Sequence, residues 1–292
     1  DDELAGRNNQ VEARERRVGN IDARSSKTFS PKKYLKMIIS KANKFVFIKG
    51  RKVAGTSVEV GLSTLCTSED ILTPITPIDE RLRLKATGLM AQNYGANAAK
   101  LKRYRKALIN SEQQTELDWS SIRKPRGTYC GHMNLTDMEE VFGGFDQDWT
   151  IIAITRCPYE QAISRIKHAA NKQAVQTRSS DSLDSNSDYF KEAKANFLRK
   201  ASNQTIRTNI DLYKDSTNKL RPTIYLRYEQ LNHDYENLMR KLGQSNAQPL
   251  PHLKKTYTTA KVTPQQLFSS DEIKIINNCF ASEFEYFGYV QL

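Results

Sequence analysis

Two short stretches of this chain carry residues whose types and spacing suit them to bind phosphate-like anions. They are Gly50–Ser57 (GRKVAGTS) and Thr155–Ser164 (TRCPYEQAIS). In the first, small residues let the backbone approach an anion, and hydroxyl and amide donors stand at an expected helix start. In the second, Arg156 offers a bidentate fork for an oxyanion, and Ser164 lies two helical turns later. The two stretches predict two anion-binding sites.

Each stretch also has a simpler interpretation, which the residues alone leave open. Gly50–Ser57 can be an ordinary turn whose hydroxyl residues only cap a helix, and Arg156 and Ser164 can be surface residues. The first stretch is also close to G-x-x-x-x-G-K-[ST], the phosphate-binding loop of nucleoside triphosphatases. However, Thr56 stands where that loop has its lysine, and Lys52 comes four residues earlier.

Histidine is the side chain that most readily accepts a proton near pH 7. The chain has four: His132, His168, His233 and His252. His132 stands between the two anion-binding stretches, although its position alone favours a ring that hydrogen-bonds a backbone carbonyl. The four cysteines are far apart, form no C-x-x-C pair and have no histidines at metal-ligand spacing. They predict buried free thiols, no metal site and a reducing compartment.

Three strand–turn–helix units are expected to position these residues. Apolar runs predict buried strands at 44–48, 149–155 and 223–228, and each is followed by a helical apolar pattern. The two anion-binding stretches occupy the first two turns. Because strands that alternate with helices form parallel sheets covered on both faces, we expect a three-layer α/β fold. A helical stripe at 273–287, ended by Gly288, predicts a face docked on the core.

The remaining segments predict one domain with an arm and two insertions. Residues 1–30 are charged and poor in aromatics, which is typical of a flexible or loosely docked arm. We expect a single domain over 31–292, with insertions at about 70–125 and 171–190. Much of the first insertion is basic and weakly periodic, which predicts helix. The Ser-, Asp- and Asn-rich stretch 171–188 predicts a mobile loop.

The composition indicates an anionic partner. The 45 Lys and Arg residues outnumber the 33 Asp and Glu residues and give a net charge of +12. Charge alone does not choose among a nucleotide, an acidic polysaccharide, a nucleic acid and a membrane surface. No run of 18 apolar residues exists, so we expect no membrane span and a cytoplasmic location. Because the sequence begins at Asp1, an anchor or signal further upstream stays open.

The first stretch resembles the 5′-phosphosulfate loop of sulfotransferases that use 3′-phosphoadenosine 5′-phosphosulfate (PAPS). That loop is usually written P-K-[TS]-[GA]-[GT]-[TS], with its lysine before the small residues, as Lys52 is here. Arg51 stands where the family commonly has proline. The second stretch resembles the family's 3′-phosphate motif, R-[DN]-P-[YF]-x-[RQ]-x-x-S, with Cys157 in place of the Asp or Asn. The resemblance runs from about residue 44 to the C-terminus, except at roughly 70–125.

Three further stretches extend the resemblance. Arg227–Leu231 is similar to a Y-E-x-L segment after a core strand, and Phe284–Tyr289 is similar to the ending of the carbohydrate-type branch. Leu250–Lys255 resembles a loop that closes over the adenosine end of the cofactor. The resemblance implies a P-loop-like sulfotransferase fold with a central, mostly parallel sheet flanked by helices. It is closest to the carbohydrate and bacterial branch.

The resemblance also implies a role for each site residue. The residues assigned to the 5′-phosphosulfate are Arg51, Lys52, Val53, Ala54, Gly55, Thr56 and Ser57. Those assigned to the 3′-phosphate are Arg156 and Ser164, assisted by Lys254 and Lys255. His132, in a G-H pair like that of hexuronic-acid sulfotransferases, would be the catalytic base. Lys52 would stabilise charge on the bridging oxygen, no metal is required, and 3′-phosphoadenosine 5′-phosphate (PAP) would be the product.

We therefore predict an enzyme that transfers a sulfuryl group from PAPS to a hydroxyl of a glycan or a small molecule. Two other classes stay open. One is a P-loop kinase that uses Mg-ATP, and the other is a non-catalytic module that binds polyanions through Lys100–Lys106 (KLKRYRK) and Arg123–Arg126. Segments 81–126 and 171–188 are expected to frame the acceptor. We expect no nucleic-acid partner, and the sequence does not predict an oligomeric state.

Overall fold

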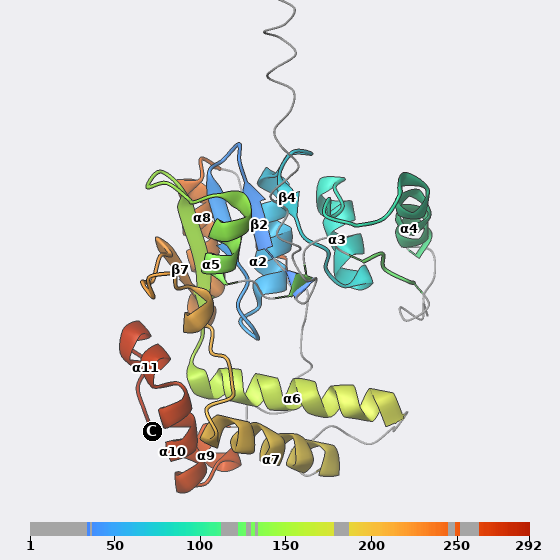
Figure 1. The fold of residues 1–292 in the computed structure, drawn as a ribbon. Helices are drawn as coiled ribbons and strands as arrows, with labels where there is room; N and C mark the ends of the chain where they lie inside the picture. Colours follow the sequence, from blue (N-terminus) through green and yellow to red (C-terminus); the bar gives the residue numbers. More distant parts are fainter. Residues whose placement is uncertain are drawn as a thin grey trace, which may run out of the picture. The chain divides into compact units, whose positions relative to one another are not determined.

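The computed structural model has a five-stranded sheet flanked by helices (Figure 1). The residues described are 34–35, 37–111, 122–126, 130–131, 134–177, 187–244, 249–251 and 263–292. The strand order in the sheet is β4-β2-β3-β6-β7. The strands are β2 (Met37–Ser40), β3 (Phe45–Ile48), β4 (Ile71–Leu72), β6 (Thr150–Thr155) and β7 (Ile224–Arg227).

The three strands predicted from apolar runs, β3, β6 and β7, lie side by side and are parallel. The sheet as a whole is mixed, because β2 is antiparallel to both β3 and β4. The turn between β2 and β3 spans only residues 41–44. A connection of this length makes a hairpin and is too short for the crossover that a parallel pair needs. The prediction of a mostly parallel sheet is therefore wrong at β2, where the pairing is antiparallel on both sides.

Helices flank both faces of the sheet, an arrangement compatible with a three-layer α/β fold. Alternate residues of β3 point to opposite faces, so Phe45 and Phe47 pack against α2 (Gly55–Leu62) and α8 (Leu231–Lys241). Short 3₁₀ turns extend these elements: η1 (Ser63–Leu65) follows α2, and η4 (Tyr228–Gln230) precedes α8. On the opposite face, Val46 and Ile48 pack with α5 (Leu135–Phe142) and with η3 (Ile210–Leu212).

A separate apolar cluster is formed by helices that follow β6 and by the C-terminal helices (Figure 1). The helices concerned are α6 (Pro158–Thr177), α7 (Asp188–Ser202), α9 (Pro264–Leu267), α10 (Ser270–Cys279) and α11 (Ala281–Phe287). The predicted C-terminal stripe is buried at Ile276, Phe280 and Phe284. It belongs to two helices, because the chain leaves helical geometry at Phe280, and Gly288 ends the second at a φ of 66°.

The prediction of a loop at 171–188 is wrong over 171–177, which are helical. Residues 171–177 continue α6, and α7 begins at Asp188, where the Ser187 side chain accepts a hydrogen bond from the Phe190 amide. The first half of this stretch contains Lys, Gln and Ala, which favour helix, and this preference outweighs the polar composition. Residues 178–186 lie outside the described part of the chain.

The described residues of the first insertion include two helices, and one of them lies in the basic stretch for which weak periodicity predicted helix. They are α3 (Pro77–Thr87) and α4 (Ala98–Asn110), and they share a small apolar cluster that includes Leu84, Tyr104 and Leu108. A two-residue parallel pair joins β1 (Tyr34–Leu35) to β5 (Cys130–Gly131). In the described residues, no helix combines the length and apolar character needed to cross a membrane.

Candidate anion-binding site

The loop between β3 and α2 adopts a conformation that leaves its amide groups available. Lys52 and Ala54 have φ angles of 62° and 61°, in the left-handed region that costs a non-glycine residue about 1–2 kcal/mol. The amide groups of Val53, Ala54, Gly55 and Thr56 have no acceptor among the described residues. Successive amides in turns of this kind, placed at a helix N-terminus, make an anion-binding concavity.

Buried polar side chains hold this loop from behind. The Asn209 side chain accepts a hydrogen bond from the Arg51 amide at 2.7 Å and donates one to the Arg51 carbonyl at 3.0 Å. Asn209 also donates to Gln161 Oε1 at 2.7 Å. Gln161 donates to Glu283 Oε2, which lies 2.6 Å away, and the Asn209 amide donates to Glu283 Oε1 at 2.6 Å. These contacts connect the loop through Asn209 to α6 and α11, so the strained backbone is held by buried side chains.

Arg156 comes directly after β6 and contacts the same loop. Its Nη1 donates a hydrogen bond to the Lys52 carbonyl at 3.0 Å, and its Nη2 lies 3.2 Å from Glu160 Oε2. The guanidinium carbon stacks over the Tyr228 ring at 3.8 Å from the centroid. Its Nε has no hydrogen-bond partner among the described residues. Arg156 is thus oriented by residues that follow all three parallel strands.

The end of β7 completes this edge of the sheet. Glu229 accepts a hydrogen bond from the Cys157 amide at 2.7 Å and another from the Tyr289 hydroxyl at 3.1 Å. The turn after β6 is therefore tied to the turn after β7. Because parallel strands present their carboxyl ends at one edge, the loops of β3, β6 and β7 converge there, which is where open α/β sheets bind ligands.

The described structure brings together some of the residues selected from the sequence. Arg51–Ser57 and Arg156 lie together, whereas Ser164 is half-buried on α6 and its side chain makes no hydrogen bond with the described residues. His132, Lys254 and Lys255 lie outside the described residues, so their assigned roles stay predictions.

Positive charge is partly desolvated beside the loop. Burial, and then the nearby Arg207, lower the pKa of the Arg51 guanidinium. Burial also lowers the pKa of Arg165, whose Nη1 donates to the Arg207 carbonyl at 3.3 Å. Glu283 is buried, which raises the pKa of its carboxyl group despite the hydrogen bonds that it accepts. A bound anion would therefore meet cations that are incompletely hydrated.

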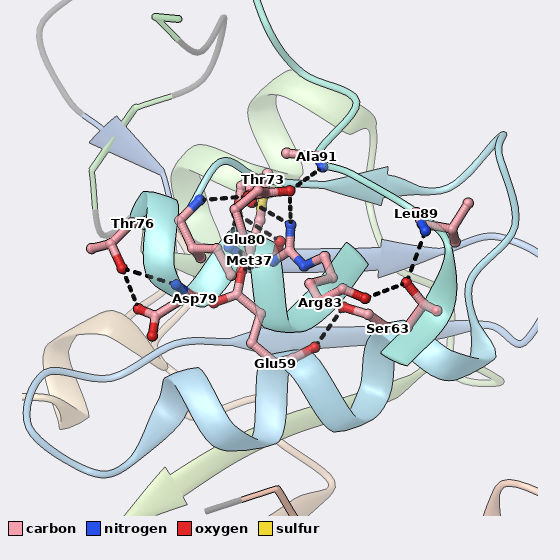
Figure 2. Close-up of polar contacts among 12 residues, drawn as sticks. Met37, Glu59, Ser63, Thr73, Thr76, Asp79, Glu80, Arg83, Leu89 and Ala91 are labelled. Atoms are coloured by element: carbon pink, nitrogen blue, oxygen red, sulfur yellow. Dashed lines mark hydrogen bonds and ion pairs between the residues drawn. The ribbon is translucent and has the colours of Figure 1, made fainter. Parts of the chain in front are cut away.

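A buried network of four charges, which the sequence analysis did not identify, connects the residue before the loop to α2 and α3, and Figure 2 shows three of its members, Glu59, Glu80 and Arg83. Lys49 Nζ lies 2.6 Å from Glu59 Oε2 on α2, and Arg83 Nη2 from α3 lies 2.8 Å from Glu59 Oε1. Arg83 Nη1 also lies 3.4 Å from Glu80 Oε1. All four side chains are at most 5% exposed. Two cations face two carboxylates, so the network is balanced in charge.

Neutral groups of the backbone also contact this network, although Arg83 Nε has no hydrogen-bond partner among the described residues. Arg83 donates to the Thr73 carbonyl at 3.0 Å, and Glu80 accepts from the Ala91 amide at 2.6 Å. Burial acts to lower the pKa of Arg83, but Glu80 and Glu59 outweigh it, so the pKa lies above its ordinary value. We call Lys49, Glu59, Glu80 and Arg83 the buried charge network. It connects the start of the loop to α3.

The lysine of this network also lies under the end of the loop between β3 and α2. A Cβ atom on Gly55 would lie 2.7 Å from Lys49 Cγ, so the lysine stem occupies the space beneath the first residue of α2. Only glycine allows this approach. The sequence carried one signal for the network, which is a glutamate at position 59 between two valines of an apolar helix.

Comparisons of the chain with protein-family models, with curated proteins and with solved structures find no match. A search of the described residues for groups of three or more His, Cys, Asp or Glu side chains able to hold a metal ion finds none.

Proposed function

We propose that this chain is a sulfotransferase that transfers a sulfuryl group from PAPS to a hydroxyl group. The observation that carries the proposal is the row of amides at 53–56 without acceptors in the described part of the chain, beside an arginine that contacts the same loop. One anion can be held by main-chain donors and another by the guanidinium. Because PAPS carries anionic groups at both ends of its ribose, it suits such an arrangement.

The reaction is a single displacement at sulfur. The acceptor oxygen forms a bond to sulfur as the bond between sulfur and the 5′-phosphate oxygen breaks, and the electron pair leaves with the phosphate. The amides of Val53–Thr56 would hold that phosphate, and Lys52 would stabilise the charge that grows on the departing oxygen. In the proposal, the acceptor proton passes to His132, while Arg156 and Ser164 hold the 3′-phosphate.

The kinase alternative receives less support from the loop. A nucleoside triphosphatase loop places its lysine next to the second glycine, where it contacts the β- and γ-phosphates, and uses the following hydroxyl for Mg²⁺. Here Thr56 occupies the lysine position, and Lys52 lies before the small residues with a left-handed backbone. The different placement of the lysine favours a sulfuryl donor over a triphosphate.

Calorimetry with PAP in the absence of Mg²⁺ tests this proposal. We expect the wild-type protein to bind PAP and Arg156→Ala to raise the dissociation constant about 10-fold or more, since a charge-assisted contact is lost. Arg199→Ala is the matched control, because Arg199 is an exposed arginine of α7 that hydrogen-bonds Asn196. It should leave the constant unchanged.

Two results would overturn the proposal. One is a folded wild-type protein that takes up no PAP. The other is a protein that binds Mg-ATP more tightly than PAP, which would support the kinase alternative.

A further inference from the structure

Two basic stretches that are separate in the sequence meet in the structure. Lys100–Lys106 lies on α4, and Arg123–Arg126 lies in the described segment 122–126. The Arg126 carbonyl accepts a hydrogen bond from the Gly95 amide at 3.0 Å, just before α4. Ile122 packs on the same apolar cluster as Tyr104 and Leu108 of α4. The two stretches therefore flank one small core.

The helix α4 separates its apolar and charged residues. Tyr104 and Leu108, four positions apart, are buried, and all five cations of the helix are exposed. The five cations are Lys100, Lys102, Arg103, Arg105 and Lys106. None of the five forms an ion pair with a residue in the described part of the chain. We call these five, together with Arg123, Lys124 and Arg126, the basic surface.

This arrangement is unfavourable for the helix itself. Lys102 and Lys106 are four residues apart, and the pairs Lys102 with Arg105 and Arg103 with Lys106 are three apart. Like charges at these spacings repel one another along a helix face. In α7 and α10, by contrast, an aspartate lies three positions before a lysine and pairs with it, as Asp188 does with Lys191 and Asp271 does with Lys274. The described segments 95–111 and 122–126 contain no acidic residue.

The position of the basic surface links it to the candidate site. α4 lies beside α3, and Arg81 of α3 donates to the Ser111 carbonyl at 3.3 Å (Figure 1). α3 in turn contributes Arg83 to the buried charge network, which reaches Lys49 at the start of the loop. A polymer bound along α4 would therefore lie on a helix that packs against α3. The buried charge network in turn connects α3 to the loop between β3 and α2.

We infer that the basic surface binds an acidic polysaccharide and that this polymer is the acceptor of the sulfuryl group. The role as acceptor rests on the proposed function. A polymer with repeated carboxylate or sulfate groups can neutralise many separate cations at once. Single-stranded nucleic acids also require aromatic side chains on which bases stack. The aromatic residues of the described part of this region, Tyr94 and Tyr104, are buried against one another. A polysaccharide therefore fits the surface better than a single-stranded nucleic acid does.

Binding of a fluorescent heparin oligosaccharide at several salt concentrations tests the inference. We expect the wild-type protein to bind it with steep salt dependence. A variant in which Lys100, Lys102, Arg103 and Lys106 are changed to Gln should bind at least about 10-fold more weakly and with a shallower salt slope. Because Gln favours helix as Lys and Arg do, the fold should persist, and PAP binding by calorimetry should not change.

The matched control removes four exposed cations elsewhere, with the same change in net charge. In this control Lys191, Arg199, Lys200 and Arg240, which are exposed on α7 and α8, are changed to Gln. Its heparin binding should stay within about twofold of the wild type, because screening limits distant charges.

Three outcomes would overturn the inference. They are no heparin binding by the wild type near physiological salt, an equal loss in both variants, or tighter binding of a short duplex DNA than of heparin. A protein that binds heparin through α4 but takes up no PAP would support the surface and refute the proposed sulfotransferase instead.

Discussion

Two neighbouring regions of this molecule handle charge in opposite ways. In the buried charge network, two cations and two carboxylates are almost completely removed from water and pair at 2.6–3.4 Å. On the basic surface, the exposed cations of α4 stand next to one another and form no ion pair with the described residues. α3 and α4 pack together, so the two arrangements share one part of the fold.

The cost of removing a charge from water gives the two regions different roles. A buried charge must be paired, because its desolvation is expensive, so the network can only fix the relative positions of the elements that supply it. An exposed charge keeps its hydration and contributes little to stability, so it stays available to a partner. The first arrangement therefore positions the loop, and the second is suited to recruit a ligand.

The largest effect is expected when one cation is removed from the buried charge network. Arg83→Met would leave Glu80 and Glu59 facing Lys49 alone, which is one uncompensated negative charge in the interior. Breaking a buried pair in this way lowers the free energy of unfolding by about 3–5 kcal/mol. Urea denaturation followed by circular dichroism would measure the change.

The control for this variant is Lys274→Met, which removes one cation from the exposed pair of Lys274 with Asp271. Its effect should stay below about 1 kcal/mol. A similar loss in both variants would mean that burial does not distinguish the two kinds of charge.

A charge-balanced double variant separates pairing from burial. Lys49→Met alone leaves an excess carboxylate in the network, whereas Lys49→Met combined with Glu59→Gln removes one charge of each sign. The amide oxygen that Glu59→Gln introduces could still accept the hydrogen bond that Arg83 donates to this side chain. A double-mutant cycle should therefore show a coupling energy of about 0.5–3 kcal/mol.

The same double variant should loosen the loop. Without the contact between Lys49 and Glu59, the side chain beneath Gly55 loses its anchor, so hydrogen exchange of the hydrogen-bonded amides at 57–62, which follow the loop in α2, should accelerate. Exchange in α7, which does not contribute to the network, is the internal reference. Additive single-variant effects with unchanged exchange at 57–62 would contradict a positioning role.

Much of the fold could be predicted because local signals were strong. β3, β6 and β7 are continuous apolar runs followed by helical periodicity, and these elements are present in the structure. β2 (MIIS) was missed although it is as long as β3 and β7, because no helical pattern follows it and it pairs with β3 through a short hairpin. The α/β class was therefore predictable, whereas the reversed edge of the sheet depends on a short turn.

The candidate site was predictable only where its residues are close in sequence. Arg51–Ser57 and the turn at Arg156 could be selected from motifs, but Asn209 supports the loop from a distance of 158 residues along the chain. Lys49 next to Gly50 is typical of an exposed strand end, and only the fold shows that it reaches Glu59 inside the protein. Long-range pairing of polar side chains leaves no local periodicity from which it could be inferred.

The smallest predicted effect is a change in stability when one exposed cation of α4 is replaced. If the cations of α4 repel one another, Lys102→Glu should stabilise the protein slightly, because it replaces a like-charge pair with Lys106 by a glutamate–lysine pair in the favourable orientation. We expect a gain of about 0.2–0.5 kcal/mol over the wild type, with Lys102→Gln between the two. Parallel urea titrations at low salt would resolve the order, and high salt should remove it. A less stable Lys102→Glu protein would mean that Lys102 already stabilises the fold, so α4 would no longer contrast with the buried charge network.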